Sequence, residues 1–409
     1  MPLALASRLP AGRLILGAAL TSAALTMAMA TPALAIRPPG PDVPRGAAYL
    51  AAPGNLVDGH FYESFPRTAD FGLTIDGALA LAASHDQNSV LKKIVGFIAQ
   101  DGRDPAGKTV NYWTGIGTRY AAGGAIGKEA LLAEVIGANP RQFGGHDLIA
   151  ALNDSVCRAA SAGSDGPCAG PGNYHDATSV FDQAYGIIAQ LRAGQASKAA
   201  APIAFLEQLR NADGSFPSLI PDSHDHDVDS TAIAVMALTL AASPSARAEV
   251  TSGLAWIASR QQRSGGFPGV GGVSVNSTGL AIQALTLRAA SYRGQLRSAL
   301  AFLASEQNAD GGFNSYASGQ RGSNVRATTQ AVSGAAGTSF GTLSDRLNLA
   351  GRAASGRGGH RGGSAAGDWF WIVIAVLWVV AIATIGPQLL RRRRRSAAQR
   401  SRTPDRITS

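Results

Sequence analysis

Aromatic and charged side chains are scarce in this chain. Phe, Trp and Tyr make up 6% of the 409 residues, and Asp, Glu, Lys and Arg make up 15%. No stretch alternates apolar and polar residues in the manner of a half-buried strand, so the pattern excludes a sheet-based architecture. What is abundant is glycine, with 49 residues, together with alanine-rich runs. This composition predicts close-packed helices with glycine-marked turns.

Only two cysteines are present, Cys157 and Cys168. Neither lies in a C-x-x-C motif or beside a histidine, which argues against a thiol or zinc site. Because the domain is expected to face an oxidising compartment, we predict a disulfide between them, with free thiols as the alternative. A loop this short would stabilise the fold by roughly 3 kcal/mol.

The first 35 residues have the pattern of a secretory signal peptide. Arg8 and Arg13 precede a short apolar run, and Ala33-Leu34-Ala35 forms an A-x-A cleavage site. The mature chain is therefore predicted to begin near Ile36, and an uncleaved anchor is the alternative.

A second apolar segment runs from Trp369 to about Leu390, long enough to cross a bilayer. Arg391 to Arg395 follow it at once, which places that side in the cytoplasm and the body of the protein outside. We predict a Gly/Ser/Arg-rich stalk at 341–367, a membrane helix at 368–390 and a basic cytoplasmic tail at 391–409. The net charge of +9 comes mostly from these terminal regions, so no nucleic-acid partner is expected.

A short motif recurs after apolar helical runs. Its copies are Gln307 with Asp310-Gly311-Gly312-Phe313, Gln261 with Gly265-Gly266-Phe267, Gln208 with Asp213-Gly214-Ser215-Phe216, and a weaker Asp58-Gly59-His60-Phe61. A spacing of about 50 residues indicates a repeat of helix pairs. One helix of each pair is amphipathic and the other is apolar nearly all round, as expected for an outer and a buried inner ring. The sequence therefore predicts an all-α fold, an α6/α6 toroid of six helix pairs over residues 36–340.

The predicted inner helices begin with similar polar residues. Asp70, Asp176, Asp229, Asn276 and Asn324 are predicted to be their N-caps. If the inner helices share one polarity, their N-termini surround one mouth of the toroid and favour an anionic group there. The residues expected at this mouth are His175, Asp176, His224, His226, Asp227, Asp229 and Asn276.

Two interpretations of the histidine-rich stretch 224–229 stay open. His224 and His226 have the chemistry of metal ligands, but their spacing fits no zinc template. A solvated loop ending in a capping Asp is the simpler interpretation, and neither a metal site nor a catalytic set is predicted.

The repeats resemble those of squalene cyclases and protein prenyltransferases across roughly 44–340. Asp227-Val228-Asp229-Ser230-Thr231-Ala232 is similar to the acid motif D-x-D-D-T-A of class II cyclases, which implies that Asp229 protonates an alkene. Ser230 stands where that family has its last Asp, and aromatic residues are few. The zinc pattern of the prenyltransferases is not matched by either cysteine.

A second resemblance involves ligand binding. Ser274-Val275-Asn276-Ser277-Thr278-Gly279-Leu280-Ala281-Ile282-Gln283-Ala284-Leu285 is similar to an inner-helix segment of intrinsic factor and the transcobalamins. The resemblance implies that Asp229 and Gln283 face a cobalamin ligand. Those proteins complete their site with a β-domain that this chain lacks, which implies a β-rich partner chain.

Three hypotheses follow. The first is a single-pass protein of the cell membrane whose extracytoplasmic toroid binds a ligand, with a corrinoid as one candidate. The second is an enzyme acting on isoprenoid substrates. The third is an interaction scaffold whose toroid is filled by its own side chains, so enzymatic activity stays uncertain.

Overall fold

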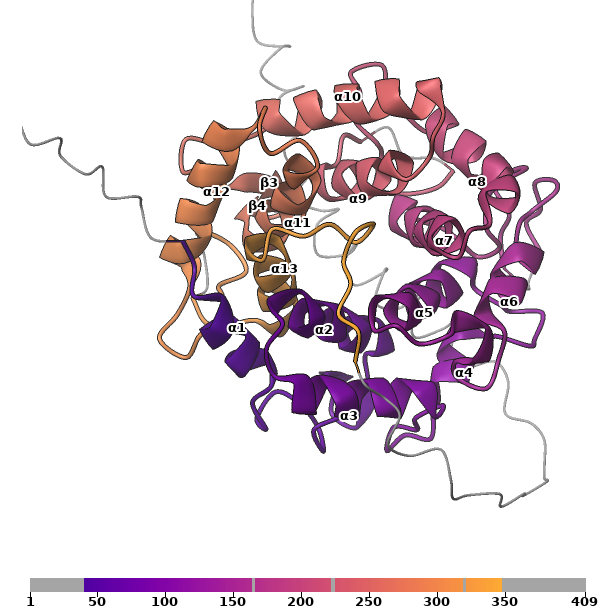
Figure 1. Cartoon of the computed structure of the whole chain (residues 1–409), viewed down its shortest axis with the longest axis horizontal. Coiled ribbons are helices and arrows are strands. Elements are labelled where there is room, and N and C mark those ends of the chain that lie inside the picture. The colour runs from indigo at the N-terminus through magenta and orange to yellow at the C-terminus, as the bar shows by residue number, and fades with distance from the viewer. Residues whose placement is uncertain (1–39, 164–165, 222–224, 319–320, 348–409) are drawn as a thin grey trace, which may run out of the picture. The chain divides into compact units, whose positions relative to one another are not determined.

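The computed structural model describes residues 40–163, 166–221, 225–318 and 321–347. The chain divides into a compact unit ending at residue 349 and a second unit, 350–409, which lies outside the described residues. The first unit consists of two concentric rings of helices (Figure 1). No described helix meets the length and hydropathy needed to cross a bilayer, and the predicted signal peptide and membrane span fall outside this range.

The inner ring contains six helices, each in contact with the next, so that the last closes on the first. They are α2 (Phe71–Ser84), α5 (Gly123–Val135), α7 (Val180–Arg192), α9 (Val228–Thr239), α11 (Val275–Thr286) and α13 (Val325–Ala335). Small residues permit this packing: a Cβ on Gly127 would lie 2.6 Å from the backbone nitrogen of Gly186 on the neighbouring helix. The glycine content seen in the sequence is thus used at helix contacts as well as in turns.

The outer ring covers the inner one. It contains α1 (Val43–Leu50), α3 (Asn88–Ala99), α6 (Leu148–Asp154), α8 (Ala196–Gln208), α10 (Pro244–Ser259) and α12 (Arg293–Glu306). A short α4 (Val110–Thr114) and a 3-10 turn, Pro140–Gln142, accompany α6. The predicted toroid of six helix pairs is confirmed within the described residues.

All six inner helices are parallel, with their N-termini at the same end of the ring. Equivalent positions near their N-termini contact one another: Asp76 Oδ1 lies 2.7 Å from Lys128 Nζ, and Asn276 Nδ2 donates to Asp229 Oδ2 at 3.0 Å. Arg326 Nη2 likewise donates to Asp70 Oδ2 at 2.8 Å. The N-termini therefore surround one mouth of the ring, as expected if the helices share one polarity.

The N-cap predictions are only partly right. Asp70 and Asn324 do cap α2 and α13. Asp229 and Asn276 do not cap, because Asp227 and Ser274, two residues earlier, accept from the free backbone N–H groups of α9 and α11. Asp176 is also not a cap; α7 begins later, with a capping box in which the Ser179 and Asp182 side chains each accept from the other's backbone N–H.

Strands are present where none was predicted, although they are very short. β1 (Glu63–Phe65) pairs with β2 (Thr68–Ala69), and β3 (Phe267–Gly269) with β4 (Gly272–Ser274), both antiparallel. They lie in loops before inner helices, and at two or three residues they are too short to show an alternating pattern.

The recurring motif holds the two rings together. The backbone N–H groups of Tyr62, Phe216, Phe267 and Phe313 each donate to a threonine hydroxyl on the following inner helix, Thr74, Thr231, Thr278 and Thr328. Gly311 has φ +93, and a Cβ there would lie 2.2 Å from a carbonyl oxygen of α1. The motif residues are thus structural, and the threonine of D-x-D-S-T-A belongs to them.

The motif glutamine joins consecutive outer helices. Gln307 donates to the Asp42 carbonyl at 2.8 Å and accepts from its N–H at 2.7 Å, which closes the outer ring between α12 and α1. In the copy assigned to Gln208, the position four residues before the motif glycine is Arg210, which pairs with Glu249 instead.

The opposite mouth is covered by the chain itself. After α13, residues 338–347 cross the C-terminal ends of the inner helices (Figure 1), and Phe340 and Leu343 are buried there. Arg192 donates to the carbonyls of Phe340, Gly341 and Leu343 at 2.9–3.1 Å. The first seven residues of the predicted stalk, 341–347, are therefore packed on the ring, and the rest lies outside the described residues.

The predicted disulfide is confirmed. Cys157 and Cys168 are bonded, with their Cα atoms 5.9 Å apart. It closes the loop between α6 and α7, on the side of the ring where α7 begins.

Candidate functional site

Within D-x-D-S-T-A, the Asp229 side chain neither caps α9 nor accepts from the backbone of the recurring motif. Asp227 accepts from the Ser230 N–H at 2.7 Å as the cap, and Thr231 accepts from Phe216 N–H. Asp229 instead turns toward α11, where its Oδ2 accepts from Asn276. Its other oxygen, Oδ1, is buried and has no hydrogen-bond partner among the described residues.

Burial, and after it the nearby charge of Asp227, raise the pKa of Asp229 from 3.8 to about 7. The polar side chains of Ser277 and Asn276 offset part of this increase in pKa. The carboxyl is thus divided between its neutral and ionised forms near neutral pH. It can either donate a proton or accept hydrogen bonds from a ligand.

A buried pair of amide side chains, Gln283 and Gln330, lies deeper in the ring than Asp229 and Asn276. Gln283 lies seven residues after Asn276, two turns along the same face of α11 and about 10 Å deeper. Its Nε2 donates to Gln330 Oε1 at 3.4 Å across to α13, whereas its Oε1 is buried without a donor in the part of the chain that the structure describes. Asp229 and Gln283 therefore each leave one acceptor unused.

Charged groups on α2, α5 and α7 form a second cluster, which the sequence analysis missed. Lys128 pairs with Asp76, and its Nζ also lies 5.1 Å from the centre of the Tyr185 ring. Burial raises the pKa of Tyr185, so its hydroxyl stays neutral. Tyr185 also packs against Phe340 of the covering segment, with ring centres 6.0 Å apart. The sequence did contain a signal for this cluster, because Asp76 and Lys128 are charged residues within otherwise apolar helices.

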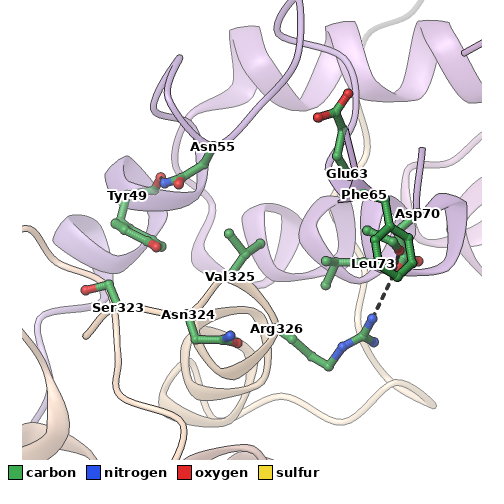
Figure 2. A pocket seen from close by; sticks show the side chains of 11 residues that line it. Tyr49, Asn55, Glu63, Phe65, Asp70, Leu73, Ser323, Asn324, Val325 and Arg326 are labelled. Carbon is green, nitrogen blue, oxygen red and sulfur yellow. Dashed lines mark hydrogen bonds and ion pairs between the residues drawn. The ribbon is translucent and has the colours of Figure 1, made fainter. Parts of the chain in front are cut away.

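An open pocket of about 600 Å³ lies at the same mouth, between α1, β1 and the N-termini of α2 and α13 (Figure 2). Arg326 and Asp70 form an ion pair at its edge, and Ser64 Oγ also donates to Asp70 at 2.8 Å. Tyr49, Ser323 and Asn324 line the other side. None of these except the two N-caps was singled out from the sequence.

His175 and Asp176 lie near the start of α5 rather than with Asp229. The His175 ring nitrogen Nδ1 lies 2.8 Å from the Ala121 carbonyl and donates to it, and its backbone carbonyl accepts from Gly123 N–H. Asp176 has φ +58, and burial raises its pKa. No hydrogen bond or ion pair of the described residues joins them to Asp229.

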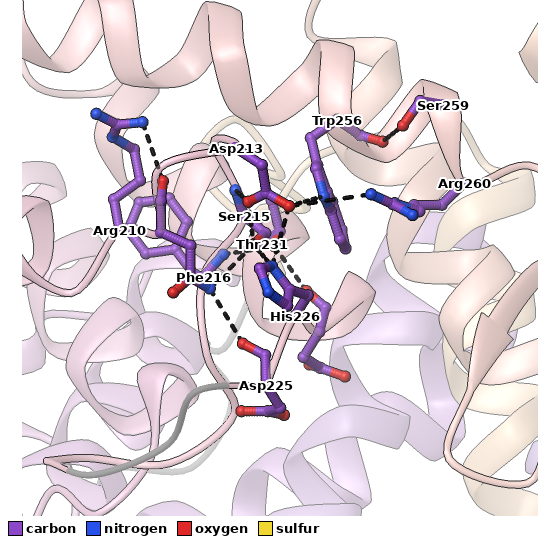
Figure 3. A network of polar contacts seen from close by, with 12 residues as sticks. Arg210, Asp213, Ser215, Phe216, Asp225, His226, Thr231, Trp256, Ser259 and Arg260 are labelled. Carbon is purple, nitrogen blue, oxygen red and sulfur yellow. Dashed lines mark hydrogen bonds and ion pairs between the residues drawn. The ribbon is translucent and has the colours of Figure 1, made fainter. Parts of the chain in front are cut away.

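His226 belongs to an exposed network around Asp213 (Figure 3). Its Nδ1 lies 3.0 Å from Asp213 Oδ2 and 2.8 Å from Ser215 Oγ, and Trp256 donates to the same carboxylate at 2.9 Å. Ser215 Oγ already donates to Asp213, and one histidine nitrogen faces both partners, which is not the relay of a Ser-His-Asp nucleophile. His224 lies outside the described residues.

No group of three or more His, Cys, Asp or Glu side chains suited to a metal is found among the described residues. The metal interpretation of the histidine stretch therefore gains no support from the placement of His226.

Comparison with known proteins identifies the fold. Residues 166–315 match the family model described as prenyltransferase alpha-alpha toroid domain. The ring is a prenyltransferase-type α/α toroid. A variant of the type II terpene cyclase MstE from Scytonema, in complex with geranylgeranyl dihydroxybenzoate, superimposes with a TM-score of 0.52 at 15% identity, over 74% of this chain and 97% of that one.

Two further toroids are similarly related. A protein from Actinoplanes gives a TM-score of 0.51 at 18% identity, over 72% of this chain and 97% of that one. Lin0763 from Listeria innocua gives 0.52 at 13% identity, over 72% and 95%. No curated protein matches the chain. At these identities the similarity establishes the toroid and not its ligand.

Proposed function

We propose that this toroid is an extracytoplasmic binding module, anchored by a single C-terminal membrane span, that takes its ligand at the mouth formed by the inner-helix N-termini. One observation carries the proposal: Asp229 Oδ1 and Gln283 Oε1 are buried acceptors without donors among the described residues. An unsatisfied buried polar group costs about 1–3 kcal/mol, which a ligand donor would recover.

The chemistry of these groups favours a ligand that presents N–H donors. Asn276 and Gln330 on the neighbouring helices add amide groups that can both donate and accept. A corrinoid, whose rim carries primary amides, is the first ligand to test. The opposite mouth is covered by residues 338–347, so the ligand would enter from the side of Asp229.

The test is calorimetric titration of the purified full chain with cobalamin. We expect saturable binding that is weakened at least tenfold by Gln283→Met or Asp229→Ala. Asp345→Asn, which changes a carboxyl at the covered end of the ring, serves as the control and should bind as the unchanged chain does. An absence of heat at high micromolar cobalamin would refute the corrinoid proposal and favour a site shared with a β-rich partner chain, or a scaffold.

A second candidate function rests on the pKa of Asp229. A carboxyl that is substantially neutral at pH 7 is suited to proton donation, and this residue occupies the position that protonates an alkene in class II cyclases. Incubation with squalene or a prenyl diphosphate, followed by mass spectrometry, tests this function. A cyclised product that is lost in Asp229→Asn would establish the enzyme, and no product would leave the binding module.

A further inference from the structure

Glu129 is a buried carboxylate for which the described structure supplies neither a cation nor a donor. It lies in the middle of α5 with 0% of its surface exposed, and both Oε1 and Oε2 lack hydrogen-bond partners among the described residues. Other buried carboxylates of the ring are paired, such as Asp76 with Lys128 and Glu134 with Arg192. Burial, and after it the nearby charge of Asp101, raise the pKa of Glu129 to about 8, so at pH 7 the carboxyl holds a proton unless a cation replaces it.

Another oxygen without a hydrogen-bond partner in the described part of the chain lies near Glu129. Asn111 Oδ1, on α4, is also buried without a donor. Glu129 Oε1 and Asn111 Oδ1 lie 2.7 and 3.9 Å from the point where a Cβ on Gly144 would stand. They therefore converge beside a glycine whose φ of +64 and missing side chain leave room for both.

A second carboxylate, that of Asp101, lies close enough for its charge to raise the pKa of Glu129. Asp101, which follows α3, accepts from the Asn111 backbone N–H at 2.7 Å through Oδ1. Asn111 Nδ2 donates to the Gly144 carbonyl at 3.5 Å, which orients the Asn111 amide. Asp101 and Asn111 are half-buried and Gly145 is exposed, so this cluster lies one layer below the surface.

We propose that Glu129, Asp101 and Asn111 hold a calcium ion between α3, α4, α5 and the loop before α6. Calcium accepts carboxylate, amide and carbonyl oxygens together in irregular geometry, whereas magnesium demands a near-ideal octahedron. When the ion displaces the proton of Glu129, the charges of Glu129 and Asp101 together match that of the ion, and water fills the remaining positions. With only two carboxylates, the dissociation constant is expected at roughly 10⁻⁴ to 10⁻³ M.

The ion would join the part of the ring that is least regular. The outer layer is there built from the short α4, α6 and the 3-10 turn in place of one long helix. A cation that binds residues from four successive segments would stabilise this arrangement against local opening.

The test is thermal unfolding of the purified full chain in EDTA and in 0.01–10 mM CaCl₂. We expect Tm to rise by about 2–4 °C at a calcium concentration ten times Kd. Glu129→Gln should abolish the rise. Asp101→Asn should also abolish or strongly reduce it, and asparagine tolerates the φ of +52 at this position.

Glu134→Gln is the matched control, because it makes the same change on the same helix at a carboxylate that has an arginine partner. It should retain the calcium response whatever its effect on Tm in EDTA. Equilibrium dialysis with metal analysis should find one calcium per chain, and none for Glu129→Gln. If that variant fails to fold, Asp101→Asn decides. A Tm that is insensitive to 10 mM calcium, or an unchanged response in Asp101→Asn, would overturn the proposal in favour of a buried water.

Discussion

Replacement of Asp229 by asparagine should stabilise the protein at neutral pH and leave it unchanged in acid. Asparagine has the shape of the neutral carboxyl and keeps an oxygen for the Asn276 donor. The native pKa of about 7 lies above the ordinary value of 3.8, so between these values the native state binds more protons than the unfolded state. The free energy of unfolding therefore falls as pH rises through this window. The asparagine variant has no carboxyl to ionise at this position and does not show this loss of stability.

The pKa difference sets the size of the effect. At 1.36 kcal/mol per pKa unit, a change from 3.8 to about 7 corresponds to at most about 4 kcal/mol. Because Asp229 as a residue is half-buried and is influenced by Asp227, we expect about 1–3 kcal/mol at pH 7.5.

Urea unfolding of the full chain at pH 4 and pH 7.5, followed by tryptophan fluorescence, measures the difference. Asp147→Asn is the control: it keeps an equally good N-cap on α6 and gives up only a solvent-accessible ion pair with Arg141, so it should change stability by less than about 1 kcal/mol at either pH. An Asp229→Asn variant that is no more stable than the unchanged chain at pH 7.5, or equally more stable at both pH values, would refute the reasoning.

Three further predictions concern what holds the ring together. Arg192→Met should lower the free energy of unfolding by about 3–5 kcal/mol, because it leaves Glu134 buried without its cation. In the same urea assay, the double variant with Glu134→Gln should recover part of that loss. Gln307→Ala should cost about 1–2 kcal/mol through loss of the bonds that join α12 to α1, whereas Gln262→Ala, at an exposed side chain, should cost less than about 0.5 kcal/mol. Replacing Cys157 and Cys168 together by serine should lower stability by about 3 kcal/mol, a loss that reduction of the unchanged chain should reproduce.

The periodicity of apolar residues is enough to predict the architecture. Apolar inner helices alternating with amphipathic outer ones, and a motif recurring about every 50 residues, require two concentric rings, because a helix that is apolar all round must be buried. The disulfide between the two cysteines was also predicted correctly, with free thiols as the alternative. These features follow from local periodicity and composition, which a linear sequence displays directly.

Contacts made in the folded ring set which aspartate of Asp227-Val228-Asp229 caps α9 and which keeps a buried oxygen without a donor among the described residues. Either side chain can accept from a free helical N–H, but the Asp227 backbone pairs with Phe216, and that contact fixes the extended conformation a cap requires. Ser274 and Asn324 are fixed in the same way by pairing with Tyr316 and Phe313. The partners lie 11 to 42 residues away, so neighbouring sequence did not reveal the register.

The partners of the buried charged residues also depend on the tertiary structure. Lys128, Glu129 and Glu134 stand within seven residues of one apolar helix, and the sequence does not distinguish them. In the folded ring Lys128 pairs with Asp76 and Glu134 with Arg192, whereas the Glu129 carboxyl has no hydrogen-bond partner among the described residues. The difference arises because successive residues of a helix point in different directions, so each one's partner is set by the element packed against that face.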